Sequence, residues 1–320
     1  MAIRYGTAGT HEDVETGRKE MREKRNMKMR GRSLLVRTGV TCALLASSLA
    51  AAEEIKIGGA GPAMGTMRLL AERYNQTHDE PKITVLAASL GSAGGIRAAT
   101  EGAIDIGVSS VPLTETEHNK GAMETEVART PFVFVVGMST PVSGLSTRQL
   151  QDIYWDTFQN KDPDWSSYVD RNLLQHDGPL PRIRIIMRPS NESDNAIIKK
   201  ISPEIDQAMT ALETRPGMIV KSTAQENAGA IEEIPGAFGT STLSLIVTEH
   251  RRIRPLAING VEPSPQSVAD GRYPYYKSVF LITGSRSSSA AQTFIAFVKS
   301  KDGREILAET GHTVVDRPKQ

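Results

Sequence analysis

Short apolar runs alternate with helical patterns along most of this chain. In the first third, the pattern predicts strands at residues 54–57, 82–88 and 104–108, helices at 64–76 and 96–101, and glycine-rich turns at 58–61 and 91–95. Strand, turn and helix repeated in this order are typical of parallel βαβ units. We therefore expect an α/β fold with ligand-binding turns at the carboxyl ends of its strands.

The same alternation continues toward the C-terminus. It predicts strands at 131–137, 183–187, 244–247 and 278–283, and helices at 146–154, 194–201, 203–212, 224–234 and 288–300. The polar stretch 158–181 is predicted to loop over the surface. Because no internal repeat and no low-complexity linker interrupts the chain, we expect two lobes joined by crossing strands.

Length and composition support two soluble lobes. The 320 residues are many for one core, and 39% hydrophobic and 23% charged residues are ordinary for a globular protein. Residues 53–320 carry 28 basic and 32 acidic side chains. A body of that sign gives no general electrostatic attraction for nucleic acid or anionic lipid, so neither is expected as a partner.

The N-terminal segment has the order of a secretory signal. Four basic residues between positions 28 and 37 precede the uncharged stretch 38–49, which ends in small residues up to Ala52. We expect residues 1–52 to be an upstream extension and a signal peptide cleaved near Ala52, with Met27 or Met29 as the start. The protein is then periplasmic. An uncleaved N-terminal anchor is the alternative interpretation.

Cysteine is confined to this segment. The single Cys42 lies inside the apolar stretch and follows Thr41, which does not fit a lipid-anchor motif. After cleavage the chain has no cysteine, so it forms no disulfide and no thiolate metal site.

Three turns of small residues are candidates for an anion site: 59–64, 92–95 and 188–195. Each follows a predicted strand and opens a predicted helix, whose first N–H groups carry partial positive charge. Arg188 could grip two oxygens of the same anion. Taken singly, each turn could instead be a tight strand-to-helix corner, and Met64 rules out a dinucleotide fingerprint in the first.

Taken together, these motifs make the chain similar to a known family. The runs Gly59-Ala-Gly-Pro-Ala-Met64, Gly91-Ser-Ala-Gly-Gly-Ile96 and Ala103-Ile-Asp-Ile-Gly-Val-Ser-Ser110, then Arg188 with Ser193 and Pro235-Gly-Ala-Phe-Gly239, resemble the phosphate-binding proteins of high-affinity phosphate ABC transporters. The resemblance implies a type II periplasmic binding protein fold, with two α/β lobes around a central ligand cleft. Lobe one would be residues 53–136 plus 248–320, and lobe two residues 137–247.

The resemblance also implies a ligand site. Backbone N–H groups of the first turn, a hydroxyl of the second, the Arg188 clamp and the start of a second-lobe helix would surround the anion. The residues at the matching positions are Ala63, Met64, Ser92, Ser110, Arg188, Ser193, Asp194 and Asn195.

Two departures from the family pattern affect the choice of anion. Family members that are specific for phosphate have a carboxylate at the position of Ser110, where it accepts the proton of hydrogen phosphate. Asp194 stands where the family has glycine, and we hypothesise that it takes over as acceptor. Alternatively, Asp194 only caps its helix, and the cleft then suits a fully deprotonated anion such as sulfate, molybdate or tungstate.

The expected function is capture of a tetrahedral oxyanion, phosphate first, for an ABC importer. Its partners would be inorganic phosphate and the permease subunits of the transporter, and the protein would be a monomer without cofactor or metal. An enzyme is not expected, because the histidines are scattered singly and no metal or nucleophile motif is present. A phosphate-ester enzyme and a sensor or adhesion protein on the same fold are the alternatives.

Overall fold

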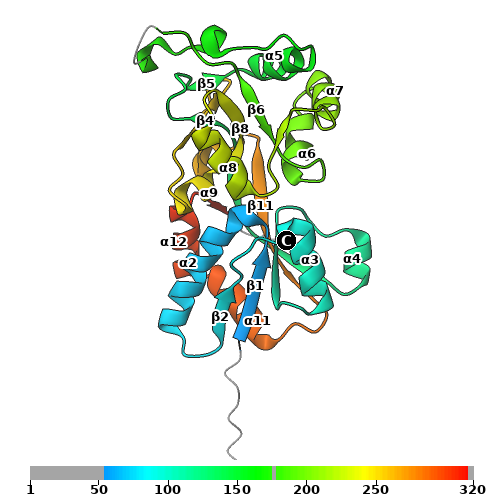
Figure 1. Cartoon of the computed structure of the whole chain (residues 1–320). Coiled ribbons are helices and arrows are strands. Elements are labelled where there is room, and N and C mark those ends of the chain that lie inside the picture. The colour runs from blue at the N-terminus through cyan, green and yellow to red at the C-terminus, as the bar shows by residue number, and fades with distance from the viewer. Residues whose placement is uncertain (1–53, 175–177, 316–320) are drawn as a thin grey trace, which may run out of the picture. The chain divides into compact units, whose positions relative to one another are not determined.

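The computed structural model describes residues 54–174 and 178–315 (Figure 1). The predicted signal peptide and its cleavage site lie outside these residues. Within the described part of the chain, no helix is both long and apolar enough to cross a membrane.

A ten-stranded mixed sheet forms the centre of the fold, in the order β2-β1-β3-β11-β4-β8-β6-β7, with β9 and β12 paired to β4. The strands are β1 (Glu54–Gly59), β2 (Lys82–Val85), β3 (Ile106–Ser109), β4 (Met123–Gly137), β6 (Arg184–Met187), β7 (Ile219–Val220), β8 (Ala237–Thr242), β9 (Ile253–Pro255), β11 (Tyr276–Thr283) and β12 (Thr313–Val314). A separate ribbon pairs β5 (Gly144–Leu145) with β10 (Ala257–Ile258).

Helices cover this sheet. They are α2 (Gly61–Thr77), α3 (Gly91–Glu101), α4 (Glu115–Asn119), α5 (Thr147–Phe158), α6 (Ser193–Lys199), α7 (Pro203–Leu212), α8 (Ala224–Glu233), α9 (Leu243–Thr248), α10 (Pro265–Ala269), α11 (Ser289–Val298) and α12 (Lys301–Glu309). The strand pairs β1–β2, β1–β3, β6–β7 and β6–β8 are parallel, as the βαβ pattern predicted. The fold is therefore mixed α/β.

The long strand β4 belongs to both halves of the sheet. Its first part, Met123–Pro131, pairs with β11, and its second part, Phe132–Val136, pairs with β8, both antiparallel. The second part is apolar at every position because both of its faces are buried. Phe132, Phe134 and Val136 pack into one cluster, while the alternating residues Val133 and Val135 pack into another.

Buried side chains form separate clusters in the two halves. One contains residues of β1, α2, β3, α11 and α12, and a second contains residues of β4, α5, α7 and β6. Leu256, Ile258 and Tyr273 pack into the second of these clusters, although they follow residue 248, where the family resemblance implied the return to lobe one. The lobe boundaries themselves stay a prediction.

The predicted strand at 244–247 is wrong, because this segment is helix α9. Thr242 is its N-cap, and the Thr242 side chain accepts the N–H of Leu245 at 3.2 Å. The strand lies immediately before it, at β8, where the sequence pattern predicted no strand. All six residues of β8 are buried, including small polar ones.

Glycine positions were also misread. Residues 91–95 were predicted to be a turn, but they form the first turn of α3, and α2 begins at Gly61 rather than at Met64. Both helices therefore begin closer to the ends of β1 and β2 than the pattern indicated.

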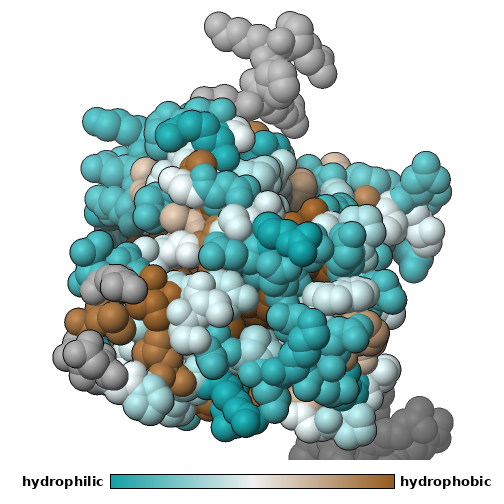
Figure 2. Space-filling model, turned by 90° about the horizontal axis from the view of Figure 1, so that it is seen from above, coloured by the Kyte–Doolittle hydropathy of each residue, from teal (hydrophilic) through white to brown (hydrophobic). Residues whose placement is uncertain are grey.

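The stretch 158–181 is only partly a surface loop. Its Trp165 is fully buried and donates its indole N–H to the carbonyl of Gly236 at 3.1 Å. Seen from above, the surface is mostly hydrophilic, with a hydrophobic group at the lower left edge and smaller hydrophobic spots elsewhere (Figure 2).

One buried histidine gives the fold a pH-dependent stability. Burial lowers the pKa of His312 to about 4, although contacts with Leu307 and Thr310 oppose this. The ring is 2% exposed and stays neutral in the folded chain at neutral pH. In the unfolded chain it binds a proton near its ordinary pKa of 6.5.

We predict that this difference destabilises the protein as the pH falls through about 6.5. Between about pH 7 and pH 5 the His312 contribution lowers the free energy of unfolding by about 2 kcal/mol. In urea unfolding, the free energy of unfolding of His312→Gln should therefore fall less between about pH 7 and pH 5 than that of the wild type. His118→Gln, at an exposed site, is the control, and equal pH dependence in all three proteins would contradict the prediction.

Candidate functional site

A cavity of about 180 Å³ lies where several helices begin. Its walls are the starts of α2 (Ala60–Pro62), α3 (Ser89–Ser92), α6 (Glu192–Asp194) and α8 (Ser222–Ala224), together with Ser110, Arg188 and Lys277. In Figure 1 the first turns of α2 and α3 point toward the half of the molecule that contains α6 and α8. The cavity is smaller than the roughly 300–1,000 Å³ of sites for drug-sized ligands, so it suits a small ion.

Three of the four helices that begin at this cavity differ from the other described helices in their caps. The N-cap residues of α2, α3 and α6 are Ala60, Leu90 and Glu192, and none of them makes a side-chain cap hydrogen bond. The remaining described α-helices all have a Ser or Thr N-cap whose side chain accepts a first-turn N–H. Helix N–H groups without a cap need another acceptor, which a bound anion can supply.

Ser89 and Ser92 modify the start of α3. The hydroxyl of Ser89 accepts the N–H of Gly91 at 3.2 Å, which satisfies one donor of the first turn. The hydroxyl of Ser92 accepts the N–H of Ser110 at 2.9 Å and so joins α3 to the end of β3. The Ser92 hydroxyl keeps its own proton for donation into the cavity.

Arg188 follows β6 and is 6% exposed. One terminal nitrogen, Nη1, donates to the carbonyl of Lys221 at 2.6 Å, and Nη2 forms an ion pair with Glu192 at 3.1 Å. Its Nε is buried and has no hydrogen-bond partner among the described residues. A buried donor without a partner costs about 1–3 kcal/mol, so this N–H favours an acceptor in the cavity.

A second buried ion pair lies across the cavity wall. The Lys277 ammonium donates a hydrogen bond to Oδ1 of Asp194, and the Thr240 hydroxyl donates to Oδ2 at 3.1 Å. Burial alone would raise the pKa of Asp194. The charge and hydrogen bond of Lys277, the charge of Arg188 and the Thr240 hydrogen bond outweigh burial and hold this pKa below its ordinary value. Asp194 is therefore an ionised carboxylate at neutral pH.

The structure brings five of the eight predicted site residues to the cavity: Ser92, Ser110, Arg188, Ser193 and Asp194. Asp194 caps no helix with its side chain, since its oxygens bind Lys277 and Thr240. Whether these five contact a ligand stays a prediction.

The other three predicted residues, Ala63, Met64 and Asn195, do not line the cavity. The side chains of Ala63 and Met64 pack in the hydrophobic core, because α2 begins before them, and the N–H of Ala63 donates to the carbonyl of Ala60 at 3.1 Å. Asn195 is buried and donates to the carbonyls of Arg188 and Pro189, so it braces the turn that carries Arg188. Their predicted ligand contacts remain untested.

Sequence reasoning missed Lys277, Glu192 and the start of α8. Lys277 is the only charged residue in the strand segment Tyr276–Thr283, and it is 5% exposed. A single charge within an otherwise apolar strand was the available signal, since Lys is almost never fully buried unless it is paired.

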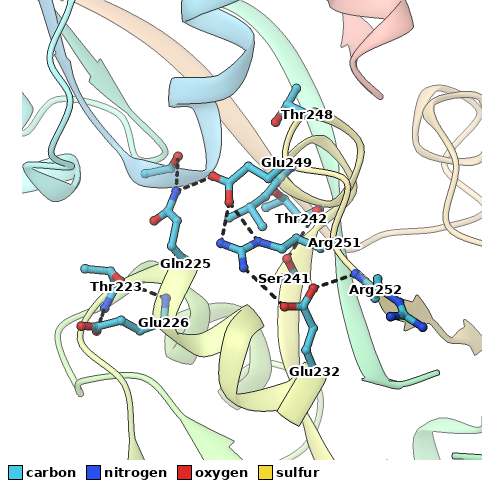
Figure 3. Close-up of polar contacts among 12 residues, drawn as sticks. Thr223, Gln225, Glu226, Glu232, Ser241, Thr242, Thr248, Glu249, Arg251 and Arg252 are labelled. Carbon is cyan, nitrogen blue, oxygen red and sulfur yellow. Dashed lines mark hydrogen bonds and ion pairs between the residues drawn. The ribbon is translucent and has the colours of Figure 1, made fainter. Parts of the chain in front are cut away.

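A polar network ties α8 to the start of α2 beside the cavity (Figure 3). Gln225 donates from Nε2 to the carbonyl of Gly61 at 3.3 Å and to Glu249 at 2.8 Å. Arg251 binds the other oxygen of Glu249 at 2.7 Å and reaches Glu232 at 3.4 Å. Two segments far apart in the sequence are therefore held together at the edge of the cavity.

A mixed sheet covered by helices, with a small polar cavity at the first turns of those helices, is typical of ligand-binding α/β proteins. A family model described as a PBP superfamily domain matches residues 46–302, and the chain belongs to this superfamily.

Known proteins of similar sequence and structure agree with this assignment. The phosphate-binding protein PstS of Bacillus subtilis is 25% identical over 268 residues, which are 83% of this chain and 82% of that protein. A substrate-binding protein from Clostridium perfringens, solved with bound phosphate, superimposes with a TM-score of 0.66 at 20% identity, over 82% of this chain and 100% of that one. An ABC-type phosphate transport receptor from Vibrio cholerae gives 0.56 at 21% identity, over 81% and 99%.

The position of α3 at the cavity depends on Gly95, which leads to a prediction. A Cβ atom at Gly95 would lie 2.8 Å from the Cα of Gly59 and 2.9 Å from the carbonyl oxygen of Val108. Because these are backbone atoms, Gly95→Ala must push α3 away from the sheet. We expect it to lower the free energy of unfolding by about 1–3 kcal/mol in denaturant titrations.

The matched control is Gly229→Ala in the interior of α8. A Cβ atom there meets nothing within 4 Å, so the substitution should stabilise the protein by about 0.4–1 kcal/mol. A Gly95→Ala protein as stable as the wild type would show that α3 is not held by this contact.

Proposed function

We propose that this protein is an exported receptor that captures phosphate in the cavity and delivers it to an ABC importer. The observation that carries the proposal is the convergence of three helix starts without a side-chain cap, together with Arg188 and the Ser92 hydroxyl, on one small cavity. All of these groups are hydrogen-bond donors. A small oxyanion supplies acceptors in several directions at once, which matches this arrangement.

The relatives support phosphate as the ligand. The Bacillus subtilis relative is named as a phosphate-binding protein, and the similar structure from Clostridium perfringens contains phosphate. We further propose export through the predicted signal peptide, a role in binding rather than catalysis, and docking of the monomer to permease subunits. Two α/β lobes, linked by β4 and β11, would close on the anion.

The proposal fits a site made of residues from both halves of the fold. Ser92 and Ser110 come from the half that contains β1, whereas Ser193 and Asp194 belong to α6 in the other half. A ligand that binds both groups favours the closed arrangement, and a permease can recognise that arrangement.

Calorimetry and thermal unfolding with a panel of phosphate, arsenate, sulfate, molybdate and tungstate test this function. We expect phosphate to bind and, at a hundredfold excess over its dissociation constant, to stabilise the folded protein by about 2.7 kcal/mol. If another member of the panel alone stabilises the protein, that anion is the ligand in place of phosphate. Absence of any response would refute the anion-receptor function.

Arg188→Met provides the site-directed arm of this test. Loss of a charged hydrogen-bond donor should weaken phosphate binding roughly 10- to 100-fold. Arg148→Met, at a site whose side chain is 75% exposed on α5, is the matched control and should bind as the wild type does. Equal phosphate affinity in both variants would show that phosphate does not bind in this cavity.

A further inference from the structure

Lys277 occupies an unusual position for a lysine. It is the second residue of β11, opposite Thr130 of β4, where the sheet passes from one half to the other. Its side chain is 5% exposed, and the ammonium lies 5.6 Å from the centre of the Phe132 ring. It also lines the cavity. Burial of an ammonium is costly, so its surroundings must compensate for the lost hydration.

Asp194 supplies only part of that compensation. In the described part of the chain, Asp194 is the one hydrogen-bond acceptor for the Lys277 ammonium, which has more than one N–H to donate. The face of the Phe132 ring attracts the charge but accepts no conventional hydrogen bond. The ammonium is therefore placed to donate to an acceptor inside the cavity.

The charges around the cavity form two pairs. Arg188 is paired with Glu192, and Lys277 is paired with Asp194, so the two cations of the lining are balanced by two carboxylates. The carboxylate of Asp194 has one partner on each oxygen and keeps unused lone pairs. An anion that enters this cavity meets the ammonium and the carboxylate together.

We propose that Lys277 is a ligand-binding residue, held beside the anion by the Asp194 carboxylate, which the sequence already suggested as the proton acceptor. The ammonium donates to an oxygen of the anion. The carboxylate repels an anion that has lost all its protons, and it accepts a hydrogen bond from an anion that retains one. This inference rests on the proposed function and deepens it, because it adds to the site a buried cation of β11 that the sequence did not predict.

A double-mutant cycle separates binding by Lys277 from mere neutralisation of Asp194. The proteins are the wild type, Lys277→Met, Asp194→Asn and the double variant. Each is titrated with phosphate and with sulfate in a calorimeter near pH 8, where both anions carry two charges. Far-UV circular dichroism and thermal unfolding confirm that each variant is folded.

We expect Lys277→Met to weaken phosphate binding roughly 10- to 100-fold. The double variant should stay at least about tenfold weaker than the wild type, because the donor to the anion is missing. Asp194→Asn should bind sulfate at least about tenfold more tightly than the wild type, since the repelling charge is gone and the ammonium is released. Lys82→Met, at an exposed site on β2, should leave both affinities unchanged.

Two results would overturn the inference. Recovery of wild-type phosphate affinity in the double variant, within about threefold, would mean that Lys277 only balances Asp194. Unchanged sulfate affinity in Asp194→Asn would remove the selecting role of the carboxylate. If Lys277→Met does not fold because Asp194 is left unpaired, the double variant compared with Asp194→Asn gives the same answer.

Failure of this inference can be told apart from failure of the proposed function. A wild-type protein that binds neither anion refutes the receptor function itself. A wild-type protein that binds phosphate and loses it with Arg188→Met, but not with Lys277→Met, keeps the function and removes only the role of Lys277.

Discussion

Buried donors without acceptors are the constraint on which the cavity depends. Ala60 and Leu90 begin α2 and α3 without offering a side-chain oxygen, while Ser or Thr caps the described helices away from the cavity. The Nε of Arg188, a residue of the cavity wall, is a further buried donor without a partner in the described part of the chain. Burial of such groups is unfavourable in isolation, so the arrangement is reasonable only if a ligand accepts their hydrogen bonds. The fold is thus locally less stable without a ligand, and a bound oxyanion would accept the missing hydrogen bonds.

The sheet holds these donors in place. Gly95 allows α3 to touch the backbone of β1 and β3, and the continuous burial of β4 fixes the second half against the first. Because β4 pairs with β11 in its first part and with β8 in its second, Lys277, opposite Thr130 on β11, sits at the junction between the halves. A ligand bound there contacts the junction itself as well as the helix starts on either side.

Much of this fold could be predicted from hydrophobic spacing, and the exceptions have a physical cause. Helix α7 and most of α5 and α8 follow a regular apolar stripe, and the continuous apolar run in β4 indicated a buried strand correctly. The strand was predicted at α9 instead of β8 because β8 is buried through small polar residues, which hydrophobic periodicity does not mark as a strand. The glycines of α3 were read as a turn, although Gly95 lies inside the helix and is required by its close packing against β1 and β3.

The two ion pairs of the cavity show why a site is harder to predict than a fold. Arg188 and Glu192 are four residues apart, so their contact is local, but it was not predicted because both residues precede the first turn of α6. Lys277 and Asp194 are separated by 83 residues, and their contact exists only because β11 crosses the sheet beside the start of α6. Sequence reasoning could assign Asp194 to the site but not its partner. The charge that an anion meets in the cavity is set by that long-range pair, so selectivity here is a property of the tertiary structure rather than of any local motif.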